Sequence, residues 1–129
     1  MLLDTHILAR WLIDARKLSR IQLRTLESAV RRGEPLALSA ISLLEIAVLA
    51  SGEKPRLQLP LEEFFKELNS NPVFRVLPLT YEVAQEAALL DLLQDPADRT
   101  IAATARVHRL KLVTADQRII GSRLVPVLE

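Results

Sequence analysis

The chain contains no cysteine and only two histidines among its 129 residues. The lack of cysteine excludes a disulfide framework and a thiolate nucleophile, and with so few histidines it also excludes a zinc site of the Cys/His type. Proteins without disulfides are typical of reducing compartments, so we expect a cytoplasmic location.

Long apolar runs are also missing. The longest ones fall far short of the roughly 20 residues that a membrane-spanning helix needs. Asp4 interrupts the start of the chain before the hydrophobic segment of a signal peptide could develop. Glycine and proline are sparse and no segment is of low complexity, so we expect neither a membrane segment nor a disordered tail.

The residues that are present have the composition of one folded domain. Hydrophobic residues make up 50% of the chain and charged residues 26%. A length of 129 residues is enough for a single hydrophobic core, so we expect residues 1–129 to form one domain. The net charge of +1 hides a basic segment near the start and an acidic one in the middle, so it indicates little about partners.

Apolar runs of strand length alternate with helical patterns along the chain. Strands are predicted at residues 1–4, 36–39, 74–79, 111–114 and 124–128. Helices are predicted at residues 5–14, from 19 to about 32, 42–50, 61–70, from 80, from 95, and 117–120. Continuous apolar strands that alternate with helices are typical of a parallel sheet covered on both faces. The sequence therefore predicts an α/β fold with a central parallel sheet of about five strands.

Four acidic residues fall where such a sheet binds ligands, at the carboxyl ends of its strands. Asp4 ends the first strand, Asp116 follows the fourth, Asp98 begins the helix before it, and Glu45 lies on an otherwise apolar helix. Each has a simpler explanation: Asp98 as a helix-dipole residue, Glu45 as part of a capping box with Ser42, and Asp116 as a turn residue. Asp4 is the hardest to explain, because a buried carboxylate needs a donor, a cation or a proton.

Together these acids favour a metal site. Carboxylates gathered at one edge of a sheet repel each other, and their pKa values rise unless a cation neutralises them. All-oxygen ligation without cysteine or clustered histidine selects a hard cation, Mg²⁺ or Mn²⁺. Such an ion binds through few carboxylates and leaves positions open for water and for the phosphate oxygens of a substrate.

Four stretches of the chain resemble the successive motifs of PIN-domain ribonucleases, in particular the VapC-type toxins of bacterial type II toxin–antitoxin pairs: LLDTHILARWL, LSAISLLEIAVLASGEKPRLQLP, DPADRTIAATARVHRLKLVTADQRI and VPVL. The resemblance covers nearly the whole chain. It implies a compact PIN-like domain and a Mg²⁺- or Mn²⁺-dependent endoribonuclease that hydrolyses RNA phosphodiester bonds. It also implies a homodimer and a cognate antitoxin that holds the enzyme inactive, with an antitoxin Arg or Lys competing with the metal for the acids.

The resemblance also assigns roles to individual residues. The family's metal-binding and catalytic quartet matches Asp4, Glu45, Asp98 and Asp116. Hydroxyl positions that support the site match Thr5 and Thr114, and the flanks of the D-P-x-D-R stretch match Asp95 and Arg99. The chain departs from the usual pattern at three places outside the quartet, where Leu44, Leu49, and Leu92 or Leu93 stand instead of an aromatic residue, a basic residue and a histidine.

Contacts with RNA are less clearly marked in the sequence. Arg16, Arg20 and Arg24 share a four-residue spacing and could contact RNA phosphates from one helix face, but a solvated face has the same pattern. Aromatic residues make up only 4% of the chain, so recognition would rest on shape, phosphates and the metal. We interpret His6 as a capping or packing residue rather than a general base.

Other functions remain open beside the nuclease. One alternative is a catalytically silent PIN-like module that binds RNA or another protein without turnover. A phosphatase of the haloacid-dehalogenase kind needs a second aspartate where His6 stands, and a receiver-type domain needs paired acids near its first strand. Metal-dependent cleavage of RNA would distinguish the nuclease from all three.

Overall fold

The computed structural model describes residues 1–129 and contains one five-stranded sheet in the order β3-β2-β1-β4-β5. All four neighbouring pairs are parallel, so the carboxyl ends of all the strands lie at one edge. The predicted parallel α/β fold is confirmed, although most strands are shorter than expected. Their bounds are β1 Leu2–Leu3, β2 Leu36–Ser39, β3 Phe74–Leu77, β4 Leu112–Val113 and β5 Val127–Leu128.

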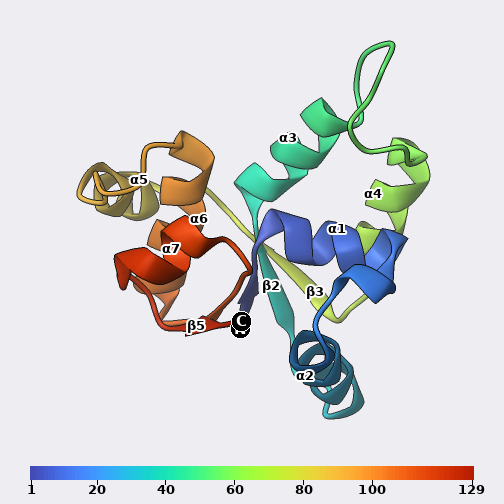
Figure 1. The fold of residues 1–129 in the computed structure, drawn as a ribbon, viewed down its shortest axis with the longest axis horizontal. Coiled ribbons are helices and arrows are strands. Elements are labelled where there is room, and N and C mark those ends of the chain that lie inside the picture. Colours follow the sequence, from blue (N-terminus) through green and yellow to red (C-terminus); the bar gives the residue numbers. More distant parts are fainter.

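Helices cover both faces of the sheet. In Figure 1 the sheet is seen between one group that holds α1, α2, α3 and α4 and a second group that holds α5, α6 and α7. None of these helices has the length and apolarity needed to cross a bilayer. Their bounds are α1 Thr5–Ile13, α2 Arg20–Arg31, α3 Ala40–Leu49, α4 Leu61–Ser70, α5 Tyr81–Ala88, α6 Pro96–His108 and α7 Gln117–Ser122, and a 3-10 turn, η1, spans Ala15–Lys17.

The core consists of two apolar layers, one on each face of the sheet. Successive side chains of a strand point to opposite faces. Leu2 therefore packs in one cluster with Ile101 of α6, whereas Leu3 packs in the other with Ile7 and Leu8 of α1. Because both layers are apolar, the strands read as continuous hydrophobic runs, which is the pattern that predicted a parallel sheet.

Local signals set the ends of several helices. Ser19 and Gln22 form the predicted capping box of α2, and Thr80 caps α5 as expected. Gly33 follows α2 with a φ of 69°, a conformation that glycine adopts without strain. The capping box suggested for Ser42 and Glu45 is wrong, because α3 begins earlier and Ser39 is its cap.

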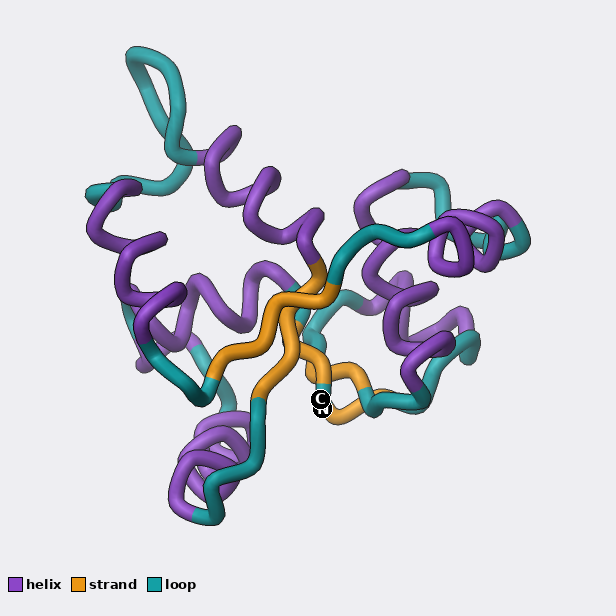
Figure 2. The backbone as a smooth tube through the Cα atoms, turned by 180° about the vertical axis from the view of Figure 1, so that it is seen from behind, coloured by secondary structure: helices purple, strands orange, loops and turns teal.

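The connections that lead from strands into helices are short at the carboxyl edge. A single residue, Asp4, separates β1 from α1, and α3 begins immediately after β2. Figure 2 shows the strands running through the centre of the molecule with the helices arranged around them. The amino-terminal ends of α1, α3 and α7 thus lie at one edge of the sheet, where the sequence places most of the acids.

Candidate active site

Helix starts hold the aspartates in place. Asp4 is the N-cap of α1, and its Oδ1 accepts a hydrogen bond of 2.8 Å from the Thr5 N–H. Asp116 caps α7 in the same way, with the Arg118 N–H as donor at 2.9 Å. Asp98 lies in the first turn of α6. The partial positive charge of a helix N-terminus stabilises each of these carboxylates.

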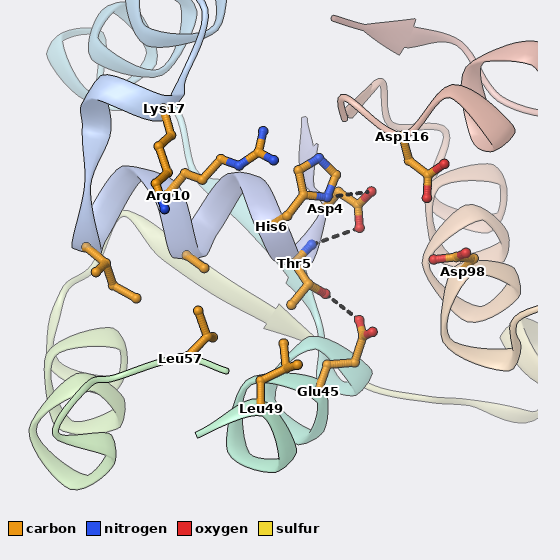
Figure 3. A pocket seen from close by; sticks show the side chains of 12 residues that line it. Asp4, Thr5, His6, Arg10, Lys17, Glu45, Leu49, Leu57, Asp98 and Asp116 are labelled. Carbon is orange, nitrogen blue, oxygen red and sulfur yellow. Dashed lines mark hydrogen bonds and ion pairs between the residues drawn. The ribbon is translucent and has the colours of Figure 1, made fainter. Parts of the chain in front are cut away.

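All four acids of the predicted quartet line one cleft. Figure 3 shows Asp4, Glu45, Asp98 and Asp116 projecting into it from α1, α3, α6 and the start of α7. The cleft has a volume of about 280 Å³. The structure therefore brings together carboxylates that are up to 112 residues apart in the sequence.

Thr114 links the first and the last acid. Its hydroxyl donates a hydrogen bond of 2.7 Å to Asp4 Oδ2 and accepts one of 3.0 Å from the Asp116 N–H. Asp4 is 4% exposed, and Thr114 is fully buried. Thr114, which directly follows β4, thus supplies one of the hydrogen-bond donors that the buried Asp4 carboxylate needs.

Thr5 makes a second link, from α1 to α3. Its hydroxyl is hydrogen bonded to Glu45 Oε1 at 2.5 Å and to Ser42 Oγ at 2.8 Å. A hydroxyl has only one hydrogen, so donation to the Glu45 carboxylate leaves Ser42 as the donor in the other contact. Ser42, one turn before Glu45 on α3, therefore fixes the rotamer of Thr5 instead of capping a helix.

His6 belongs to the same network. Its Nε2 accepts a hydrogen bond of 3.0 Å from the Ala115 N–H, and its Nδ1 lies 3.5 Å from Asp4 Oδ2. An accepting Nε2 carries no proton, so the ring is neutral and its hydrogen is on Nδ1, facing Asp4. Burial lowers the pKa of His6 although the Asp4 carboxylate beside it acts in the opposite direction. His6 thus does not cap the helix but ties α1 to the segment before Asp116.

The cleft concentrates negative charge. Burial, together with the charges of Asp95, Asp116 and Asp4, raises the pKa of Asp98 to about 6. Burial also raises the pKa of Glu45, against the effect of its hydrogen bond from Thr5. At neutral pH, ionisation of these two side chains therefore costs free energy in the folded chain, and a nearby cation would remove that cost.

Arg118 is the cation that the chain itself supplies. Its Nη2 lies 3.0 Å from Asp116 Oδ2 and 3.7 Å from Asp98 Oδ2. The hydrogen bond from Arg118 lowers the pKa of Asp116. The Arg118 side chain is 75% exposed, so this pairing is weak and the guanidinium is free to move away.

The donor set fits a hard divalent cation. Every side chain of the quartet offers carboxylate oxygens, the ligands that Mg²⁺ and Mn²⁺ prefer, and the raised pKa of Asp98 reflects its burial together with the neighbouring carboxylates. As the side chains stand, no three of the acids converge closely enough to surround one ion. Ligation through few carboxylates, with water completing the shell, agrees with both facts.

Two further residues assigned by the resemblance lie beside the cleft rather than in its lining. Asp95 caps α6 by accepting from the N–H groups of Ala97 and Asp98. The Arg99 side chain donates to the backbone oxygen of Leu93 and so fixes the loop that leads into α6. Both therefore act on the position of Asp98.

The arginine stripe lies away from the acids. Arg16 is exposed and pairs with Asp14 at 3.0 Å. Arg20 and Arg24 are exposed on α2, which lies at the bottom of Figure 1, below α1 and on the side where β2 begins. None of these three arginines lines the cleft. Their contact with RNA stays a prediction.

Sequence reasoning did not find four residues of this region. They are Ser42, Arg118 and two cations that line the cleft, Arg10 and Lys17. Arg118 stands two residues after Asp116, and Arg10 follows His6 by one helical turn, so a local spacing existed in both cases. Nothing in the sequence around Ser42 or Lys17 distinguishes them from ordinary helix and turn residues.

Comparisons with known proteins agree with this fold. The family model of the PIN domain matches residues 1–121. Ribonuclease VapC22 of Mycobacterium tuberculosis is 35% identical over 125 residues, which are 95% of this chain and 92% of that protein.

Solved structures show the same architecture. The crystal structure of FitAcB from Neisseria gonorrhoeae matches with a TM-score of 0.70 and 26% identity, covering 99% of this chain and 96% of that one. VapBC2 from Rickettsia felis, bound to a DNA fragment from its promoter, matches with a TM-score of 0.71 and 16% identity, covering 98% of this chain and 96% of that one. At this low identity the match shows the fold alone. The family match and the similarity to VapC22 together show that this chain belongs to the PIN domain family and is of the VapC type.

Proposed function

We propose that the chain is a metal-dependent endoribonuclease toxin that hydrolyses RNA phosphodiester bonds at the acidic cleft and is held inactive by a cognate antitoxin. The observation that carries the proposal is the gathering of four carboxylates in one cleft, where burial and crowding raise the pKa of Asp98 to about 6. The similarity to a protein named a ribonuclease supports the same activity.

The four acids have different roles in this proposal. Asp4, Asp98 and Asp116 would supply carboxylate oxygens to a Mg²⁺ or Mn²⁺ ion, directly or through its water shell. Glu45 would complete the site, bind a second ion through water or orient the attacking water. When bound, such an ion neutralises charge on the phosphate and activates water as a Lewis acid. The hydroxyls of Thr5 and Thr114 keep Glu45 and Asp4 in fixed rotamers, so the site is organised before substrate arrives.

An antitoxin inhibits the enzyme by covering this cleft. One similar structure is titled a toxin–antitoxin complex from Klebsiella pneumoniae, which supports a protein partner here. On this chain, Leu44 and Val48 are exposed one turn apart on α3, the helix that carries Glu45. An antitoxin segment that packs on these leucine and valine side chains lies close enough to direct an Arg or Lys at the acids, where it competes with the metal.

The chain also forms a homodimer in this proposal. Tyr81, Leu89 and Leu92 are 93%, 72% and 69% exposed around α5, on the group of helices opposite α1. Exposed apolar side chains of this size are found at surfaces that another protein covers. Light scattering of the purified chain, compared with a Leu89→Glu variant, measures whether the dimer exists and depends on this surface.

The decisive experiment measures cleavage of labelled RNA by the purified chain, free of antitoxin. We expect cleavage with Mg²⁺ or Mn²⁺ that is lost on adding EDTA and is abolished by Asp4→Asn. Circular dichroism of the variant checks that the fold survives. Full activity of Asp4→Asn would contradict the assignment of the quartet.

The same experiment tests the alternative function, a catalytically silent PIN-like module that binds RNA or another protein. RNA binding without metal-dependent cleavage would favour that alternative and overturn the enzyme. Addition of the protein encoded beside this chain, followed by its removal, tests the antitoxin: activity should disappear and then return.

A further inference from the structure

The acidic cleft continues beyond the acids along α1. His6, Arg10 and Ile13 follow one another at intervals of four and three residues and so share one face of the helix. All three line the cleft. The opposite face of α1 carries Ile7 and Leu8 into the core, so the helix cannot rotate and the cleft face is fixed.

This extension is positively charged. Arg10 and Lys17 line the cleft, and neither belongs to any ion pair of the structure, whereas the nearby Arg16 is paired with Asp14. Figure 3 shows the Arg10 guanidinium extending toward His6 and the acids, with Lys17 on the side farther from the acids. The cleft therefore has an acidic end and a basic end.

An apolar wall lies beside the two cations. It consists of Ile13, Leu49 and Leu57, and a backbone hydrogen bond of 2.9 Å from the Leu57 N–H to the Leu49 oxygen holds the loop after α3 against that helix. Uncharged surface of this kind suits a sugar and base better than a second charged group. Acid, cation and apolar surface thus follow one another in a single cleft.

The spacing fits a neighbouring nucleotide. Asp4 and Arg10 are six residues apart, which is about 9 Å along a helix that rises about 1.5 Å per residue. A stacked strand advances about 3.4 Å per nucleotide, so this distance corresponds to about two or three nucleotides.

We propose that Arg10 and Lys17 bind a backbone phosphate of single-stranded RNA close to the scissile phosphate, and that they thereby position the strand over the acids. This inference rests on the proposed function. It assigns the phosphate contacts to the end of α1 and to η1 rather than to the arginines of α2.

The test compares two double variants that remove the same amount of charge. Arg10→Ala with Lys17→Ala removes the cleft cations. Arg31→Ala with Lys111→Ala removes two exposed cations that precede β2 and β4 and so lie at the opposite edge of the sheet. Binding of a fluorescein-labelled single-stranded RNA is measured by anisotropy in EDTA at several salt concentrations, so that no cleavage interferes.

We expect the cleft variant to raise Kd about tenfold. The slope of log Kd against log salt concentration should fall by about 0.7 for each phosphate that the protein no longer neutralises. The control variant should change Kd by no more than about twofold. In cleavage assays with Mg²⁺, the cleft variant should raise KM with little change in kcat, because it removes binding rather than chemistry.

Three outcomes would overturn the inference: equal Kd values for the cleft variant and the wild-type chain, an equal weakening of binding in both double variants, or a larger weakening in an Arg20→Ala/Arg24→Ala variant. Failure of the proposed function has a different result. The wild-type chain would then bind RNA without cleaving it, and the contrast between the two double variants would persist.

Discussion

The imidazole of His6 and the backbone of Ala115, 109 residues apart in the sequence, are joined by a hydrogen bond of 3.0 Å from the Ala115 N–H to His6 Nε2. With Nδ1 facing Asp4, the ring spans the two strand ends that carry the first and last acids. A neutral ring that contacts both segments in this way holds Asp4 and the residues before Asp116 in position.

Replacing His6 tests this positioning role. His6→Ala leaves the Ala115 N–H without its acceptor, which costs about 1–3 kcal/mol, and frees the segment before Asp116. We expect a lower melting temperature and a higher Mg²⁺ concentration for half-maximal thermal stabilisation. His6→Gln, whose amide oxygen can accept the same hydrogen bond, should recover much of both effects. A role in packing alone would change the melting temperature without changing the Mg²⁺ requirement.

Thr114→Val should destabilise the fold far more than Thr114→Ser. Valine has nearly the same shape but removes the hydroxyl that serves both Asp4 Oδ2 and the Asp116 N–H. Asp4 Oδ2 then keeps only His6 Nδ1, 3.5 Å away, and the Asp116 N–H loses its acceptor, so we expect the free energy of unfolding to fall by about 2–4 kcal/mol. Urea denaturation measures the difference. If valine and serine were equivalent, the hydroxyl bridge would be unimportant.

The raised pKa of Asp98 predicts that ionisation of this side chain lowers the free energy of unfolding of the metal-free chain. The folded state holds the Asp98 proton up to about pH 6, whereas an unfolded aspartate releases it near pH ~4. The free energy of unfolding therefore decreases as pH rises through this window, and the cost stays present above it.

Asp98→Asn should remove that cost. In EDTA we expect this variant to be more stable than the wild-type chain by about 1 kcal/mol at a pH of about 7.5 and close to it in stability at a pH of about 3, below the pKa of an unfolded aspartate. Urea denaturation at the two pH values provides the measurement. A gain of the same size at both would show that the effect is unrelated to ionisation.

Arg118 competes with a divalent cation for Asp98 and Asp116. Arg118→Ala should lower the Mg²⁺ concentration for half-maximal thermal stabilisation about threefold, because the acids are then without their internal counter-ion. Arg118→Lys keeps the charge and should remain close to the wild-type chain. Without metal, the alanine variant should melt close to the wild-type temperature, since the side chain is 75% exposed. An unchanged or higher Mg²⁺ requirement in Arg118→Ala would argue against competition.

Sequence reasoning was most accurate where the signal was local. The capping box at Ser19 and the helix start at Asp95 were predicted at the correct residues, because both depend on side chains within three positions of the cap. It misjudged Ser42, which has capping-box spacing but lies inside α3. The preceding Ser39 caps that helix because β2 ends there, and the end of a strand is decided by its pairing with neighbours.

His6 shows the same limit at the site. In the sequence it is a lone histidine at the start of a helix. Its link between α1 and the segment before Asp116 depends on a hydrogen bond with Ala115, which only the tertiary structure shows. The spacing of Arg10 from His6 was not enough to identify it, and Lys17 had no local signal, because a cation on a helix or turn is ordinary until the surface that it faces is known.

The sequence by itself determined the alternation of buried strands with helices and the position of the three aspartates at or near a strand or helix end, since both follow from patterns over a few residues. Only the tertiary structure decided which ends meet. The order β3-β2-β1-β4-β5 places β1 between β2 and β4, so that Asp4 lies between the elements that carry Glu45 and Asp116. The hydrogen bonds that join Thr5 to Ser42, His6 to Ala115 and Thr114 to Asp4 span at least 37 positions, a separation over which no local pattern extends.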